Sequence, residues 1–231
     1  MDPQVLGIAA SLAVLTAALS SLSLRGLMRF ARSHFPTELM WGVGLALASV
    51  ATAGELLVYL GVVTTPLLQL YVFLSAAIVG MLSLGSTRVL RQRSVRVGYT
   101  AYTLAACALV AVFSFTTPLS PASMVTGGVI SGNPPATLLV LSSLVTVPAT
   151  LVLLGAVLLA LRKQWRWRTV MMGIGASVLA AGGALYIASF PVALYYSEFV
   201  GIVLITLGLV SLPHVSAVQD STGHAAAAAA K

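Results

Sequence analysis

MWGVGLALASVATAGELLVYL, residues 40–60, is a stretch in which Glu55 is the only charged side chain. A helix of about 20 apolar residues is long enough to cross a hydrocarbon core of about 30 Å. The stretch therefore predicts a membrane-spanning helix. It also raises a question about function, because an ionised carboxylate is costly in such surroundings.

The composition of the whole chain indicates the same fold class. Of 231 residues, 59% are hydrophobic and 7% are charged, whereas roughly a quarter of the residues of a soluble domain are charged. The mean hydropathy is +1.03. So few charges cannot cover the water-exposed surface of a protein of this length, which excludes a soluble globular protein.

Apolar windows recur along the chain and predict seven transmembrane helices. The predicted fold class is an all-α, multi-pass membrane protein, with one transmembrane domain over residues 1–215 and a short cytoplasmic tail over residues 216–231. Pro148 lies inside the fifth span. We expect it to open the backbone there and leave a carbonyl group for a neighbouring helix to satisfy. The predicted spans cover residues 4–24, 38–61, 66–87, 98–117, 136–161, 169–190 and 194–214.

The cationic residues predict the orientation of the chain. Eleven of the twelve Lys and Arg residues fall in the first, third and fifth loops. By the positive-inside rule these loops are cytoplasmic, so the N-terminus lies outside and the C-terminus inside. Topology and attraction to anionic lipids of the cytoplasmic leaflet account for the formal charge of +7, and we expect no nucleic-acid partner. The eleven residues are Arg25, Arg29, Arg32, Arg88, Arg91, Arg93, Arg96, Arg162, Lys163, Arg166 and Arg168.

The two halves of the chain share a sequence pattern. Residues 40–60 and MMGIGASVLAAGGALYI (171–187) share a Met, then G[VI]G, Ser-Val, Ala-Gly and a Tyr near the outer end. LLQLYVFLSAAIVGMLSLG (67–85) and VALYYSEFVGIVLITLGLVSL (192–212) share a Leu-Tyr pair and glycines further in. Chance similarity between segments rich in Ala, Gly, Leu and Val is the alternative to a true repeat.

The shared pattern predicts parallel repeats over residues 1–90 and 136–215, with the helix at 98–117 as their linker. This 3+1+3 layout resembles the architecture of sugar transporters of the SWEET class, of vitamin transporters of the PnuC class and of trimeric intracellular cation channels. The segments LLQLYVFLSAAIVGMLSLG and YYSEFVGIVLITLGL are also similar to small seven-helix prokaryotic membrane proteins of unassigned role. That similarity implies a prokaryotic plasma membrane, and neither resemblance identifies a substrate.

The residues that commonly bind cofactors or metals are not positioned to form such a site. Cys107 is the single cysteine, and His34, His214 and His224 lie at cytoplasmic ends or in the tail, so the spans contain no histidine pair for haem. VYLGVVTTPLL (58–68) resembles the third helix of microbial rhodopsins, but the last span has no lysine to form a retinal Schiff base. We therefore expect no cofactor and no metal. We also expect no enzymatic activity, because the Ser and Thr residues of span five lack an adjacent base.

Polar side chains in the outer half of the bundle form the candidate site. Glu55 lies roughly 9 Å inside the outer end of its span and Glu198 about 6 Å inside its own, with Gln69 near the same level. Tyr59 and Tyr195 lie one turn from the two acids. These five residues predict an outward-facing vestibule that selects a small cation or polar solute and couples to protons. Alternatively, each Glu hydrogen-bonds a neighbouring helix, or Glu198 reaches the membrane surface.

The sequence leaves two classes of function open. The first is a transporter or channel, which the repeat and the buried polar level favour. The second is a non-catalytic subunit or scaffold of a larger membrane complex, which the short soluble parts and the absence of a substrate motif favour. The expected partners are the lipid bilayer and either further copies of this chain or other membrane subunits. The uncharged outer loop over residues 116–137 is a lid, a partner contact or a linker.

Overall fold

The structure, a computed structural model, is almost entirely helical over the residues that it describes, and five of their helices are long and apolar enough to cross a membrane. These helices are α1 (Pro3–Ser33), α2 (Pro36–Tyr59), α3 (Thr65–Ser86), α4 (Arg93–Thr116) and α6 (Ala136–Lys163). The described residues are 3–87, 92–126, 129–130 and 134–163, with pieces at 170–171, 174–175, 178, 200–201 and 203–204.

The five long helices coincide with the first five predicted spans. The prediction of an almost entirely helical chain whose helices are long and apolar enough to cross a membrane is therefore confirmed for the first five spans. The spans predicted for residues 169–190 and 194–214 lie almost wholly outside the described residues. The total of seven helices, the parallel repeat and the orientation in the membrane consequently stay predictions.

The predicted end of the first span, at residue 24, is wrong. The helix continues to Ser33, so the first three arginines lie on its last turns and not in a loop. Arg is a good helix former, and cations are favourable near the negative end of the helix dipole. The helix ends where His34 adopts a positive φ of 54° and Pro36 begins α2. α4 also begins earlier than predicted, at Arg93, where the helix propensity of Arg applies but the helix dipole does not favour a cation.

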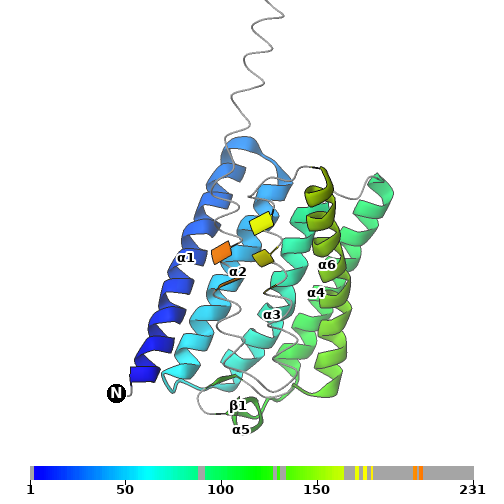
Figure 1. The fold of residues 1–231 in the computed structure, drawn as a ribbon. Helices are drawn as coiled ribbons and strands as arrows, with labels where there is room; N and C mark the ends of the chain where they lie inside the picture. Colours follow the sequence, from blue (N-terminus) through cyan, green and yellow to red (C-terminus); the bar gives the residue numbers. More distant parts are fainter. Residues whose placement is uncertain are drawn as a thin grey trace, which may run out of the picture.

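The helices stand side by side and alternate in direction (Figure 1). α2 packs between α1 and α3, and α3 also contacts α4 and α6. Short connections force this arrangement, because two helices joined by a tight turn pack against each other. Between α2 and α3 the chain reverses at Gly61, whose φ of 91° suits glycine. α3 thus contacts most of the other long helices that the structure describes.

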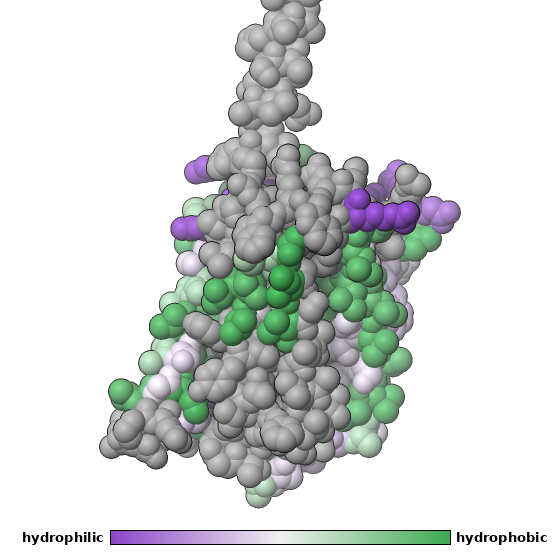
Figure 2. Space-filling model, in the orientation of Figure 1, coloured by the Kyte–Doolittle hydropathy of each residue, from purple (hydrophilic) through white to green (hydrophobic). Residues whose placement is uncertain are grey.

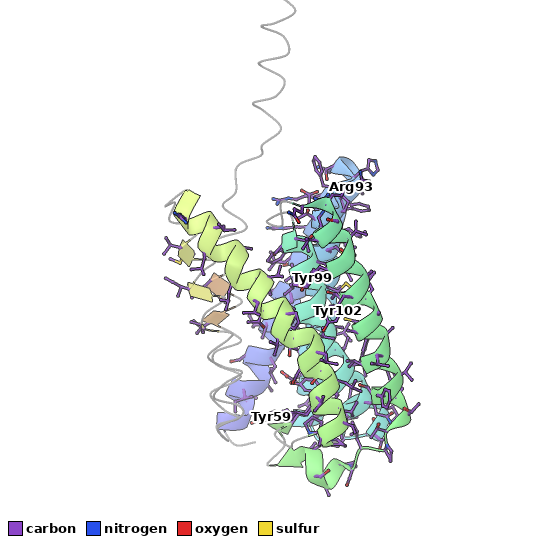
Figure 3. The ribbon with its side chains drawn as sticks, turned by 90° about the vertical axis from the view of Figure 1, so that its right-hand side faces the viewer. Tyr59, Arg93, Tyr99 and Tyr102 are labelled. Carbon is purple, nitrogen blue, oxygen red and sulfur yellow. The ribbon has the colours of Figure 1, made fainter. Side chains whose placement is uncertain are left out.

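Cations gather at one end of the bundle, which we call the basic end. The last turns of α1 and α6 and the first turn of α4 meet there, carrying Arg32, Arg162 and Arg93. Figure 2 shows hydrophilic side chains at this end above a broad apolar band. Arg93 is labelled there in Figure 3. A protein that crosses a bilayer needs this separation of charged ends from an apolar middle.

The opposite end carries a small cap, which we call the hairpin cap. It consists of Leu119 and Ser120 followed by α5 (Pro121–Met124), β1 (Val125–Thr126) and β2 (Val129–Ile130). The two strands pair antiparallel, with Val125 opposite Ile130. Figure 1 shows this cap beneath the ends of α2 and α3. The described residues of the loop predicted at 116–137 therefore include a segment that packs on the bundle through Leu119, Met124 and Ile130.

Hydroxyl groups join α1 to α2 along their contact. Ser23 Oγ donates a hydrogen bond to the carbonyl oxygen of Gly42 over 2.8 Å. Closer to the hairpin end, Thr16 Oγ1 donates to Thr52 Oγ1 over 3.1 Å, and the hydroxyls of Ser20 and Ser49 lie 2.6 Å apart. Interhelical hydrogen bonds between small polar side chains are a common source of helix association in lipid.

Glycines let the helices approach closely. A Cβ on Gly26 would lie 3.1 Å from the Cα of Gly42 across the α1–α2 contact. On α3, a Cβ on Gly85 would overlap the indole ring of Trp41 from α2. Small residues at such crossings increase van der Waals contact between backbones. Gly26 and Gly42 therefore serve helix packing at this crossing.

Pro148 behaves as the sequence predicts. It lies inside α6 and has no amide hydrogen, so the carbonyl oxygen of Leu144 loses its partner within the helix. Tyr102 on α4 donates its phenolic hydrogen to that oxygen over 2.7 Å. The expectation that a neighbouring helix satisfies the freed carbonyl is confirmed. Tyr102 is 43% exposed, so this bond borders the surface that faces lipid.

Replacing Tyr102 with Phe should lower the free energy of unfolding by about 1 kcal/mol, because the carbonyl of Leu144 is left without a donor. In a Pro148→Ala background the loss should shrink, since the amide of residue 148 then donates to the same oxygen. Chemical unfolding in detergent micelles, performed as a double-mutant cycle, measures the difference. Equal losses in the two backgrounds would contradict the proposed pairing.

Replacing Gly85 with Ala should destabilise the protein by about 1–3 kcal/mol, because the new methyl group overlaps Trp41 and forces α2 and α3 apart. Gly98 on α4 provides a matched control, since a Cβ there meets no atom within 4 Å. Gly98→Ala should be neutral or stabilise the helix by up to about 1 kcal/mol. Thermal unfolding of both variants compares them, and equal midpoints would refute the close contact.

Candidate functional site

Glu55 lies on α2 one turn before the helix ends at Tyr59. Figure 3 shows Tyr59 towards the end of the bundle opposite Arg93, so Glu55 belongs to the half nearer the hairpin cap. Its side chain is 3% exposed. Among the described residues it is the one buried acidic side chain, which makes it the polar group with the highest expected cost of burial.

One oxygen of the Glu55 carboxyl group has a partner on the next helix. Tyr71 of α3 donates its phenolic hydrogen to Glu55 Oε1 over 2.6 Å. A bond this short is typical of a hydroxyl that donates to a charged carboxylate. Tyr71 thus fixes the direction of the carboxyl group and holds it against α3.

The other oxygen, Oε2, is buried and has no hydrogen-bond partner in the part of the chain that the structure describes. Leaving a buried acceptor unpaired costs about 1–3 kcal/mol, and more when the group is charged. Such atoms are rare in native proteins, and each one calls for an explanation. Oε2 is therefore the one oxygen of the Glu55 carboxyl group without a hydrogen-bond donor among the described residues.

Apolar residues separate Glu55 from the hairpin end. Val58, one turn further along α2, packs with Leu68 and Val72 of α3. On the other side of this cluster the hairpin cap contributes Met124 and Ile130, both almost completely buried. The cap therefore closes the end of α2 and α3 beyond Glu55.

A buried hydroxyl lies on the opposite side of Glu55, towards the basic end. Thr52 precedes Glu55 by three residues and so shares its face of α2. Its Oγ1 accepts the hydrogen bond from Thr16 and lies 3.1 Å from the carbonyl oxygens of Ala48 and Ser49. The surroundings of Glu55 on α2 are thus oxygen-rich on one side and apolar on the other.

The other predicted site residues either have different partners from Glu55 or lie outside the described residues. Gln69 lies near the level of Glu55, but its Nε2 donates to the carbonyl oxygens of Thr117, over 2.9 Å, and Phe115, over 3.4 Å. Its amide therefore caps the end of α4, and no hydrogen bond joins it to Glu55 within the described part of the chain. Tyr59 is the last residue of α2 and is partly exposed. Glu198 and Tyr195 lie outside the described residues.

Sequence reasoning missed Tyr71 as the partner of Glu55. Glu55 lies four residues before the end of α2 and Tyr71 six residues after the start of α3, so the tight turn places them at nearly the same depth. This register was readable from the sequence. The rotation of α3 about its axis, which turns Tyr71 and not Gln69 towards α2, could not be predicted from the sequence.

The arrangement can hold a positively charged group, because a carboxyl oxygen with no partner is a strong acceptor in a medium of low dielectric constant. In the described part of the chain, no three His, Cys, Asp or Glu side chains come together as a metal site would require. The site is thus a single carboxyl group held by a phenol.

Comparison of the chain with known protein families, with curated proteins and with solved structures finds no match. The case for a function consequently depends on the geometry around Glu55.

Replacing Tyr71 with Phe should lower the free energy of unfolding by about 1–3 kcal/mol, since both oxygens of Glu55 would then lack the phenolic donor. The matched control is Tyr99→Phe. Tyr99 shares a hydrogen bond of 2.7 Å with Ser83, a neutral hydroxyl, so its loss should cost less, about 1 kcal/mol. Unfolding in detergent compares the two. A Tyr71→Phe variant as stable as the wild type would contradict a structural role for the phenol.

Proposed function

We propose that this membrane protein is a transporter or channel for a small cation or polar solute, with Glu55 in its pathway. The observation that carries the proposal is the unpartnered, buried Oε2 of Glu55. A carboxylate inside the membrane costs up to about 2.5–3.5 kcal/mol on insertion scales, less towards the interface, and such residues commonly mark substrate or ion pathways. The proposal includes no catalytic step.

In this proposal the vestibule of the sequence analysis contains Glu55 together with Tyr71. Glu198 and Tyr195 remain members of it as sequence predictions, and Tyr59 lies at its edge. The hairpin cap covers the α2–α3 end beyond Glu55, so solute entry from that side requires the cap to move. The protein acts in the plasma membrane of a prokaryote, with the basic end at the anionic cytoplasmic leaflet.

The competing function is that of a non-catalytic subunit. Under it, Glu55 and Tyr71 would only join α2 to α3, and Oε2 would have no ligand. Buried polar pairs often serve such specificity in helix packing, but a pair with both partners neutral would do so at lower cost. The open oxygen is what favours transport over a purely structural role.

A flux assay in proteoliposomes tests the proposal. Glu55→Gln removes the charge while keeping the shape, and should reduce flux of the transported solute by about tenfold or more, because the pathway loses its anionic group. Glu38→Gln is the matched control. Glu38 lies at the basic end, where it accepts a hydrogen bond from Ser33, and its variant should retain wild-type flux.

Unchanged flux in Glu55→Gln for every solute that the wild type transports would remove Glu55 from the pathway. If the wild type transports none of the alkali cations, ammonium ions or small polar solutes tested and co-purifies in fixed stoichiometry with other membrane proteins, the subunit function would replace the proposal.

A further inference from the structure

The charge balance around Glu55 limits what can bind there. In residues 39–87, which include most of α2, the turn and all of α3, Glu55 is the only charged side chain. The described residues around it contribute no cation, and Tyr71 contributes only a neutral donor. A ligand with one positive charge would leave the site neutral. Held by Glu55 alone, a divalent ion would leave one uncompensated positive charge buried in a medium of low dielectric constant, which is strongly unfavourable. Balancing a divalent ion would take a second carboxylate such as Glu198, and the calcium arm of the experiment below tests for that case.

The protein atoms available for binding also favour a monovalent cation over a divalent one. The open Oε2 of Glu55 is a hard, anionic oxygen. Carboxylate and hydroxyl oxygens suit hard cations, whereas soft metals prefer sulfur and imidazole. Calcium takes six to eight oxygens, commonly from several carboxylates, and magnesium keeps much of its water. One carboxyl group one turn from a cluster of buried apolar residues resembles neither kind of divalent site.

A neutral polar solute fits the site poorly. Sites for such solutes hold them with several converging polar groups in addition to apolar contacts. At Glu55 the phenol of Tyr71 is already engaged with Oε1, and Val58, Leu68 and Val72 form the wall towards the hairpin end. One open carboxyl oxygen provides charge but little of the shape-dependent hydrogen bonding that a sugar or an amide would need.

We infer that Glu55 binds one monovalent cation, held through Oε2, and that this ion is the species moved in the proposed function, on which the inference rests. The occupant is an alkali ion, an ammonium ion or a proton, three sources of the same single positive charge. Tyr71 orients the carboxyl group for binding and is a positioning residue.

Thermal unfolding of the purified full-length chain in detergent tests the inference without measuring transport. A ligand that binds only the folded state raises the midpoint in proportion to the logarithm of its concentration once the site is saturated. The probes are NaCl, KCl, NH4Cl and CaCl2, and choline chloride keeps the ionic strength constant. Each salt is tested at pH 5.5, 7 and 8.5, values roughly one unit or more apart, so that binding of a proton can be distinguished from binding of a metal ion. One of the first three salts, or the proton, should raise the midpoint of the wild type by several degrees.

Three variants make the outcome specific to Glu55. Glu55→Gln should lose the response, and Glu38→Gln should keep it. Glu55→Asp keeps the charge but retracts the carboxyl group by one methylene, so it should respond to the same cation at a concentration about tenfold higher. Should Glu55→Gln fail to fold, the Asp variant and the control still decide the question.

The inference is overturned if calcium stabilises the wild type at lower concentration than every monovalent salt, if Glu55→Gln responds as the wild type does, or if neither salt nor pH shifts the midpoint. These results are separable from the flux assay. Stabilisation by a monovalent cation without flux would retain the site and reject transport, whereas Glu55-dependent flux of a neutral solute would retain transport and reject the cation.

Discussion

The hydrocarbon core of a bilayer offers no hydrogen bonds, so every polar group placed in it must find its partner within the protein. The described structure follows this constraint at several places where the sequence departs from a plain apolar helix. The carbonyl freed by Pro148 receives the phenol of Tyr102, and the hydroxyls between α1 and α2 pair with each other or with backbone oxygens. Among the described residues, two buried side-chain atoms lack a hydrogen-bond partner, Ser114 Oγ and Glu55 Oε2, and only the second belongs to an acidic group.

The sequence predicts most of the fold because length and apolarity are nearly sufficient to identify a membrane helix. All five described long helices were located, and the role of Pro148 was anticipated down to the kind of partner that it would need. The errors fall at the cationic ends, where α1 extends to Ser33 and α4 begins at Arg93. Hydropathy marks where lipid ends, whereas a helix continues as long as its backbone and its arginines favour it.

The candidate site was predictable only in part. The depth and burial of Glu55 follow from its position in an apolar run, and the structure agrees with a buried carboxyl group. The identity of its partner depends on the rotation of α3 about its axis. Gln69 and Tyr71 lie two residues apart, so they point in directions that differ by about 200° on a helix of 3.6 residues per turn. Only packing decides which of them faces α2, and single-helix periodicity does not contain that information.

The bond between Tyr102 and Leu144 also bears on how the protein is made. α6 cannot satisfy its own backbone at Pro148, so a solitary α6 would carry an exposed carbonyl into the bilayer. The phenol that covers this carbonyl comes from α4, which precedes α6 in the chain and is synthesised first. The donor that α6 requires has therefore already been synthesised when α6 is made. If a rearranged gene encoded α6 before α4, α6 would be synthesised before the phenol that donates to its free carbonyl group.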